Sequence, residues 1–346
     1  MRKNIHGIQY LRGYAALLVV FNHLWSTGGM IPTYLRFNII GGFGVDIFFV
    51  ISGFIMAYTI NDSRKENNIK AGREFIKKRI LRIYPLHLLV LIPILFIYLA
   101  KCIVRKTEIS FYSIVGSFFL IPDLTGSDSY AMINPVEWTL VYEMTFYLSL
   151  SAFIMIIPEK KNCLIGYGFF IIVMITIVKL FDIQGSRLGW VNLRHMIGDP
   201  LFLDFIMGFL VYFLSKKITI KITTNQIVMI LIMLCVAFVF MAESGLPRLV
   251  SSGIPAFILV LIFTIDTNVN ERKNNFLLLL GGASYAIYLI HPLYIPAHKA
   301  INYVFPSIGE KNDLVSFLIS LSAIITGVFV YKYIEPLLNS KNKKIT

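Results

Sequence analysis

Ten apolar stretches of roughly membrane-spanning length follow one another along this chain and leave little room for anything else. A helix needs about 20 mostly apolar residues to cross the hydrocarbon core of a bilayer. Of the 346 residues, 57% are hydrophobic and only 15% are charged, whereas soluble domains average about 25% charged residues. We therefore predict an all-α fold, a polytopic integral membrane bundle of about ten transmembrane helices.

We expect one membrane-embedded domain over residues 1–346, with no soluble accessory domain. The predicted helices are 8–26, 41–60, 80–100, 138–157, 164–181, 201–215, 226–242, 249–266, 276–298 and 315–337. The apolar segment 109–122 is bounded by proline and too short to span, so we interpret it as re-entrant or interfacial. The two halves of the chain show no internal repeat.

Basic residues lie in the short segments between the apolar stretches, which is typical of cytoplasmic loops. Ten spans put both termini on one side; if that side is cytoplasmic, the inside segments carry 19 Lys and Arg and the outside segments 9. The longest extramembrane segments are then 61–79, inside, and 101–137, outside. We predict a multi-pass protein of the plasma (inner) membrane with both termini cytoplasmic. Its net charge of +13 indicates membrane lipids rather than nucleic acid as partners.

Three cysteines, Cys102, Cys163 and Cys235, are far apart and show no C-x-x-C spacing. They indicate neither a disulfide framework nor a metal site, and no metal is expected.

Ionisable residues inside apolar stretches are candidates for function, because burying one in a bilayer costs at least about 2.5–3.5 kcal/mol. In the first stretch, Arg12 and His23 are eleven residues apart, which puts them on one helix face about 16 Å apart along the axis. Asp46, near the outer end of the second, could orient the imidazole of His23. The alternatives are a snorkelling Arg12, an interfacial His23 and a surface carboxylate at Asp46.

Arg79 and Arg82 are neighbours on one helical face at the expected cytoplasmic surface, where forked guanidinium groups suit phosphate. The alternative is an anchor that binds lipid headgroups. Glu143 lies almost two turns inside the fourth stretch, so it needs a partner or a wet cavity; a structural ion pair with a buried Arg is the alternative.

Three more residues are candidates for lining such a cavity. Trp138 and Tyr142 share the fourth stretch with Glu143, and His291 lies inside the ninth, before Pro292. His291 is alternatively a polar residue associated with a kink. We interpret His6, His87, His195 and His298 as interfacial or loop residues.

These segments together resemble the acyltransferase-3 family of membrane acyltransferases, with most similarity to the branch that O-acetylates exopolysaccharides and O-antigens. The motifs that carry the resemblance are Arg12-(ten residues)-His23, GVDIFFVISGF at 44–54, Arg79-x-x-Arg82 before Tyr84-Pro85, WTLVYE at 138–143, SYAIYLIH at 284–291 and YKYIEP at 331–336. The segment Thr139-Leu-Val-Tyr142 replaces the Ser-rich segment that this family commonly has after the tryptophan, and Glu143 stays in register. The motifs run in the expected order from the first stretch to the last.

The resemblance implies ten core helices, essential roles for Arg12 and His23, a cytoplasmic acyl-CoA donor such as acetyl-CoA, and an acceptor hydroxyl on a polysaccharide or lipid-linked oligosaccharide. We expect Arg12, Arg79 and Arg82 to guide the donor phosphates. His23 would be a general base or an acylated nucleophile, oriented by Asp46 or Glu143. The rivals are a transporter or flippase for lipid-linked sugars, which predicts internal pseudo-symmetry, and a non-catalytic scaffold of an envelope polysaccharide complex.

Overall fold

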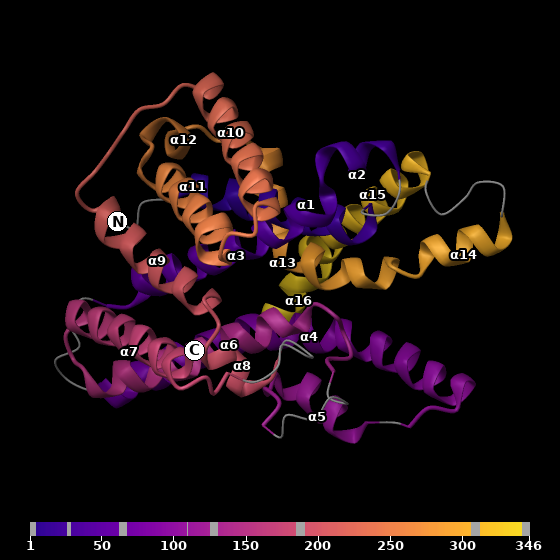
Figure 1. Ribbon diagram of the computed structural model, residues 1–346, viewed down its shortest axis with the longest axis horizontal. Coiled ribbons are helices and arrows are strands. Elements are labelled where there is room, and N and C mark those ends of the chain that lie inside the picture. Colours follow the sequence, from indigo (N-terminus) through magenta and orange to yellow (C-terminus); the bar gives the residue numbers. More distant parts are fainter. Residues whose placement is uncertain are drawn as a thin grey trace. The chain divides into compact units, whose positions relative to one another are not determined.

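The computed structural model describes residues 5–25, 29–61, 68–108, 110–124, 131–184, 191–305 and 312–340. Within these ranges the chain is helical, with two isolated β-bridges, Asp123 with Asn192 and Ile220 with Asp266, and no strand (Figure 1). The predicted all-α class is confirmed.

The described elements, in chain order, are α1 (His6–Leu24), α2 (Met30–Leu35), α3 (Phe37–Thr59), α4 (Asn68–Arg105), α5 (Phe111–Phe119), α6 (Glu137–Ile156), α7 (Lys160–Leu180), α8 (Leu193–Ile197), α9 (Leu201–Ser215), α10 (Thr224–Glu243), the π-helix η1 (Leu249–Gly253), α11 (Ile254–Ile265), α12 (Thr267–Glu271), α13 (Asn275–Ile290), the 3-10 turn η2 (His291–Tyr294), α14 (Ala297–Val304), α15 (Asp313–Phe329), the π-helix η4 (Val330–Ile334) and α16 (Glu335–Ser340).

Among the described residues, seven helices are long and apolar enough to cross a membrane. They are α3, α4, α6, α7, α10, the run that starts with α13 and the run that starts with α15. The shorter apolar helices are α9 and the η1–α11 pair, and α1 is more polar because it carries Arg12, Asn22 and His23. Within the described residues, each of the ten predicted stretches is largely helical, and the chain is a multi-pass membrane protein; seven of its described helices meet the criteria for a span.

The predicted loop 61–79 is largely helical. The helix α4 begins at Asn68 and runs for 38 residues through Pro85 and Pro93. The positive charges before residue 80 mark the edge of the apolar stretch, but they do not end a helix, because Lys and Arg are good helix formers. Residues 62–67 of this loop, and 109 and 125–130 of the predicted outer segment, lie outside the described residues.

The ninth stretch is interrupted at His291 and Pro292. The helix α13 ends at Ile290, and His291 opens the 3-10 turn η2 with Pro292 behind it. Proline cannot donate the next helical hydrogen bond and clashes with the preceding turn. The predicted interfacial segment 109–122 contains the nine-residue helix α5, which Ser110 caps through its side chain.

The chain divides into two compact units. The first comprises residues 1–58 and 204–337. In this unit α1 packs along α13. Gly13 lies against Gly281, and ten residues further along each helix His23 contacts His291. The two helices are therefore parallel. Any side chain on Gly281 would overlap the carbonyl oxygen of Gln9. This glycine therefore sets the close approach that brings the ends of both helices together.

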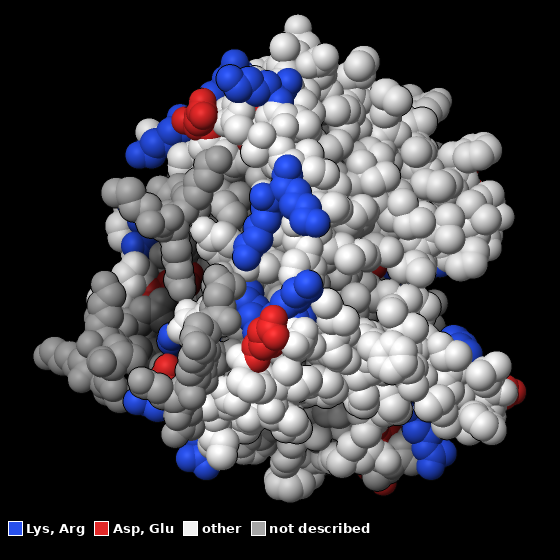
Figure 2. All heavy atoms as spheres, turned by 90° about the vertical axis from the view of Figure 1, so that its left-hand side faces the viewer, with Lys and Arg blue, Asp and Glu red and all other residues white. Residues whose placement is uncertain are grey.

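The helix α3 is the most buried of the seven described helices that could span a membrane. In the apolar window of α3, 72% of the residues are buried, compared with 6% for α10. A helix with so little buried surface in a membrane protein faces lipid. On the face in Figure 2, Lys and Arg form a few groups, some of them beside Asp or Glu, and most of the remaining described surface is neither basic nor acidic.

The second unit comprises residues 59–203 and 338–346. Its centre is an antiparallel pair, α4 with α6. The Ser151 hydroxyl donates to the carbonyl of Gly72 over 3.0 Å near one end, and His87 meets Glu137 near the other. The helix α7 packs on α6, where the ring of Tyr167 lies edge-on to Phe146.

Candidate active site

His23 and His291 form a hydrogen-bonded pair in the first unit. Nδ1 of His23 lies 2.9 Å from Nε2 of His291, and the ring centroids are 5.0 Å apart. His23, in the last turn of α1, is exposed, whereas His291 is completely buried. The parallel packing of α1 on α13 thus places the buried imidazole of His291 within hydrogen-bonding distance of the exposed imidazole of His23.

Asp46 is another buried ionisable group of this unit. Its carboxylate accepts from Nη2 of Arg248 over 2.7 Å and from Nε over 3.2 Å. The carbonyl of Gly42 accepts from the same guanidinium over 3.4 Å. Asp46 is fully buried in α3, and the Arg248 side chain is 28% exposed. The expected contact of Asp46 with His23 is therefore replaced by two separate pairs, His23 with His291 and Asp46 with Arg248.

Arg12 lies on α1, three turns before His23. Its Nη1 donates to Oε1 of Gln9 over 3.4 Å, one turn back on the same helix, and it is half-buried. Eleven residues of helix separate it from His23 by about 16 Å along the axis. The two predicted residues share a helix without meeting.

Arg79 and Arg82 differ in their surroundings. Arg79 is only 8% exposed; it donates to the hydroxyl of Thr59 over 2.9 Å, and its guanidinium lies 5.4 Å and 5.9 Å from the ring centres of Phe75 and Tyr147. The predicted surface position of Arg79 is wrong, because aromatic faces of α4 and α6 enclose its delocalised charge. Arg82 is exposed and remains available to an anion.

The N-terminal turns of α4 carry an open hollow of about 650 Å³. Lys70, Arg73 and Lys77 line it together with Ile69 and Glu74. Three cations at helical spacing against one carboxylate make this hollow positive, which suits a phosphate-bearing ligand.

Tyr142, predicted to line a cavity, is fully buried. Its hydroxyl donates to Oδ2 of Asp199 over 2.9 Å, and its ring stacks on Phe202. Trp138 lies edge-on to Tyr142 with a centroid distance of 5.7 Å. Both Trp138 and Glu143 are half-buried on α6.

Asp199 receives three donors. Besides Tyr142, the backbone N–H of Leu201 donates over 3.0 Å, and Nε2 of His195 lies 3.4 Å away. Burial opposes the charge of this carboxyl, but the hydrogen bonds from His195, Leu201 and Tyr142 hold the pKa of Asp199 below its ordinary value. The ionised carboxylate therefore joins α6 to the start of α9.

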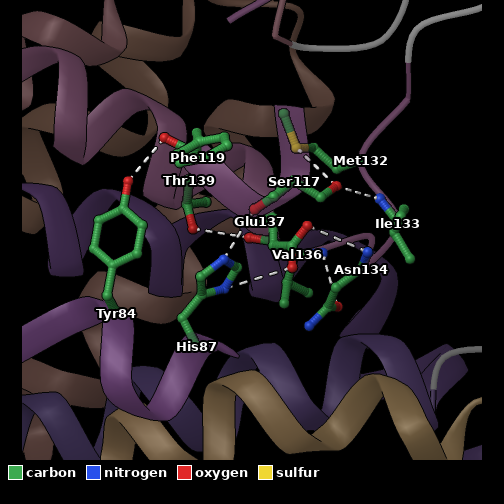
Figure 3. A network of polar contacts seen from close by, with 10 residues as sticks. All are labelled: Tyr84, His87, Ser117, Phe119, Met132, Ile133, Asn134, Val136, Glu137 and Thr139. Carbon is green, nitrogen blue, oxygen red and sulfur yellow. Dashed lines mark hydrogen bonds and ion pairs between the residues drawn. The ribbon is translucent and has the colours of Figure 1, made fainter. Parts of the chain in front are cut away.

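A polar network that the sequence did not reveal joins α4 to α6 (Figure 3). His87 and Glu137 are 1% and 0% exposed, with Nδ1 3.5 Å from Oε1. Nε2 of His87 lies 2.9 Å from the carbonyl of Ser117, and the Ser117 hydroxyl accepts from the backbone N–H of Ile133 over 2.8 Å. The interpretation of His87 as interfacial is wrong, because the apolar α4 buries it against α5 and α6.

Among the partners that the sequence did not identify, Arg248 is a lone cation before an apolar stretch and His87 a lone histidine within one. A buried ionisable group requires a partner, but the sequence does not say which of several it takes. His291 is a candidate because it lies inside an apolar stretch before Pro292, and the structure places it against His23.

Comparison with known proteins agrees with the motifs. The sequence profile of the acyltransferase-3 family, described as an acyltransferase domain, matches residues 5–333. The chain is 28% identical over 308 residues to the exopolysaccharide production protein ExoZ of Rhizobium meliloti, covering 86% of this chain and 90% of that protein. It is 27% identical over 205 residues to the peptidoglycan O-acetyltransferase OatA of Listeria monocytogenes, covering 54% of this chain and 31% of OatA. No solved structure is significantly similar.

Proposed function

Because this chain belongs to the acyltransferase-3 family and is an acyltransferase of the O-acetyltransferase type, we propose that it acylates a polysaccharide at the cell envelope. The group transferred is acetyl or another short acyl group, and the donor is cytoplasmic acyl-CoA. The acceptor is a hydroxyl of a cell-surface or lipid-linked polysaccharide, such as an exopolysaccharide or the O-antigen of a lipopolysaccharide. Similarity to ExoZ over nearly the whole length of both chains supports an exopolysaccharide acceptor.

The observation that carries this proposal is the exposed imidazole of His23 at the end of α1, hydrogen-bonded to buried His291. Acyl transfer from a thioester to a hydroxyl needs a group that takes up the hydroxyl proton. A neutral imidazole is the side chain best suited to this near neutral pH.

In the general-base route, the hydroxyl proton passes to a ring nitrogen of His23 while the hydroxyl oxygen bonds to the thioester carbonyl carbon. The carbon–sulfur bond then breaks, and the CoA thiolate takes the proton back from the imidazole, which leaves an ester and a free thiol. In the nucleophilic route, the ring nitrogen first bonds to the thioester carbonyl carbon, and the carbon–sulfur bond breaks to release the CoA thiolate. The hydroxyl oxygen then displaces the imidazole from the acyl group, and the hydroxyl proton passes to the thiolate, which leaves an ester and a free thiol.

Basic residues would form the binding site for the acyl-CoA donor. Arg82, exposed on α4, and the positive hollow at Lys70, Arg73 and Lys77 would hold the phosphates. Arg12, on α1, would contact the pantetheine arm of the donor. Buried Arg79 would contribute mainly by fixing α4 against α6. Asp46 would support the first unit, which carries His23, through Arg248. Glu143, half-buried on α6, is a further candidate catalytic residue.

The distribution of Lys and Arg supports cytoplasmic termini and a donor that enters from the cytoplasm of a plasma (inner) membrane. An acceptor exported to the envelope would then approach from the other side.

The test is an assay with purified protein and acetyl-CoA labelled in the acetyl group. Release of CoA thiol over many turnovers requires an added acceptor polysaccharide, and the label appears in the polysaccharide. Mass spectrometry of envelope glycans with and without the gene should show the loss of one acetyl group per modified sugar. Transport of intact sugar without thiol release would contradict the proposal and favour a flippase.

A further inference from the structure

The hydrogen bonds of the histidine pair determine which ring nitrogen of each imidazole carries the proton. Nδ1 of His291 lies 3.3 Å from the carbonyl oxygen of Ile287, one turn back on α13. A carbonyl oxygen can only accept, so Nδ1 of His291 carries the hydrogen. In a neutral imidazole the other nitrogen, Nε2, is then an acceptor.

The second hydrogen bond follows from the first. Nε2 of His291 faces Nδ1 of His23 at 2.9 Å. Because Nε2 of His291 is the acceptor, Nδ1 of His23 must be the donor. Neutral His23 then has its lone pair on Nε2, the nitrogen that does not face His291. His23 is exposed whereas His291 is buried. The lone pair on Nε2 of His23 is therefore the one in this histidine pair that a substrate can approach.

Burial keeps His291 neutral. It has no exposed surface, and a buried cation without a counter-charge is very unfavourable. Within the described part of the chain, its side chain meets the ring of Tyr288 at 5.8 Å, His23, and the Ile287 carbonyl, and it forms no ion pair. A neutral acceptor thus replaces the carboxylate that commonly orients a catalytic histidine.

We infer that His291 is a positioning residue that holds His23 in the Nδ1–H tautomer and thereby makes Nε2 of His23 the reacting nitrogen. This inference rests on the proposed function of His23, and it applies to both routes, because proton uptake and nucleophilic attack each need an unprotonated ring nitrogen. Nε2 takes the hydroxyl proton, or bonds to the acyl carbon, while Nδ1–H goes on donating to His291. Without His291, the His23 imidazole can carry its hydrogen on Nε2. A protonated Nε2 can neither take up the hydroxyl proton nor bond to the acyl carbon.

The test compares a variant that keeps a hydrogen-bond acceptor at position 291 with one that lacks it. In His291→Gln, the side-chain amide places an oxygen where Nε2 was, so it accepts from Nδ1 of His23. His291→Leu fills the space without an acceptor, and His6→Leu is a matched control at the start of α1. We expect His291→Leu to lower kcat by about 10²–10⁴-fold, as when a catalytic histidine loses its orienting partner, with donor KM changed less than about threefold. His291→Gln should stay within about tenfold of the parent, and His6→Leu within about twofold.

A second measurement does not depend on activity. Nitrogen-15 NMR of histidine-labelled protein separates protonated from unprotonated ring nitrogens, and His23→Ala identifies the signals of His23. We expect Nδ1 protonated and Nε2 unprotonated in the parent and in His291→Gln, and loss of this preference in His291→Leu.

The outcomes separate the inference from the proposed function. Parent-like kcat in His291→Leu, or a protonated Nε2 on His23 in the parent, would overturn the inference while His23 keeps its role. Full activity in His23→Ala would instead remove His23 from the chemistry, although the NMR result could still agree with the tautomer. Equal loss of kcat in His291→Leu and His291→Gln would show that packing, rather than the acceptor atom, is what matters.

Discussion

Replacement of Arg248 by leucine should destabilise the first unit much more than loss of an exposed ion pair. Asp46 is fully buried in α3 and receives both Nη2 and Nε of Arg248, at 2.7 Å and 3.2 Å. Removing one partner of a buried pair costs about 3–5 kcal/mol, because the remaining charge is left without compensation. Since the Arg248 side chain is 28% exposed, we expect the lower end, about 3 kcal/mol.

The chain provides its own control. Arg36 and Glu243 form an ion pair of 3.1 Å in the same unit, with side chains that are 49% and 45% exposed. Exposed pairs contribute about 0–1 kcal/mol, so Arg36→Leu should change stability little.

The assay is equilibrium unfolding of the purified protein in mixed micelles with increasing dodecyl sulfate. The double variant Asp46→Asn/Arg248→Leu removes both charges and should recover much of the loss, with a coupling free energy of about 1–3 kcal/mol between the two sites. Equal destabilisation by Arg248→Leu and Arg36→Leu, or strictly additive single effects at Asp46 and Arg248, would refute this reasoning.

Three further predictions concern the site. His23→Ala should insert normally and lose glycan acylation by about 10²–10⁴-fold while acyl-CoA still binds; an active variant would contradict the mechanism. Arg82→Ala should raise donor KM more than it lowers kcat, because phosphate contacts hold substrate and transition state alike, and an unchanged donor KM would remove Arg82 from the site. Glu143→Gln should lower activity while the protein still reaches the membrane, and parent-like turnover would reduce Glu143 to a structural role.

A fifth prediction concerns acid stability. Hydrogen bonds hold the pKa of Asp199 below its ordinary value, so the ionised carboxylate stabilises the fold above the unfolded-state pKa of about 3.9. That contribution is lost as the pH falls below about 4 through the folded value. Asp199→Asn should therefore flatten the decline of stability below pH 4 in unfolding measurements, and an unaltered pH profile would contradict the assignment.

The helical elements could be predicted because apolar length is a strong signal. The stretch 201–215 coincides with α9, and 138–157 differs from α6 by one residue at each end. The start of α4 was missed because charge marks the membrane boundary rather than the helix boundary. The break after Ile290 is signalled by Pro292, although its consequence, the placing of His291 against α1, depends on tertiary packing.

The sequence identifies candidate residues for the site but not the pairs that they form. Arg12, His23 and Asp46 are identifiable because an ionisable group inside an apolar helix is energetically unfavourable unless it has a function or a partner. That Asp46 takes Arg248, and that Arg79 lies between aromatic rings, depends on contacts between helices far apart in the chain. Helical periodicity gives the face of a residue, but it does not give the neighbour on that face.

The length of α4 has a consequence for the lipids around the protein. Its 38 residues give a rod of about 57 Å at 1.5 Å per residue, almost twice the roughly 30 Å of a hydrocarbon core. Its first three turns, which bear Lys70, Arg73, Lys77 and Lys78, are therefore long enough to stand among and beyond the headgroups. Each such cation near an anionic bilayer surface contributes about 1 kcal/mol of attraction. The tilt of α4, and with it the height of Arg82 above the acyl chains, should then change with the fraction of acidic phospholipid in the bilayer.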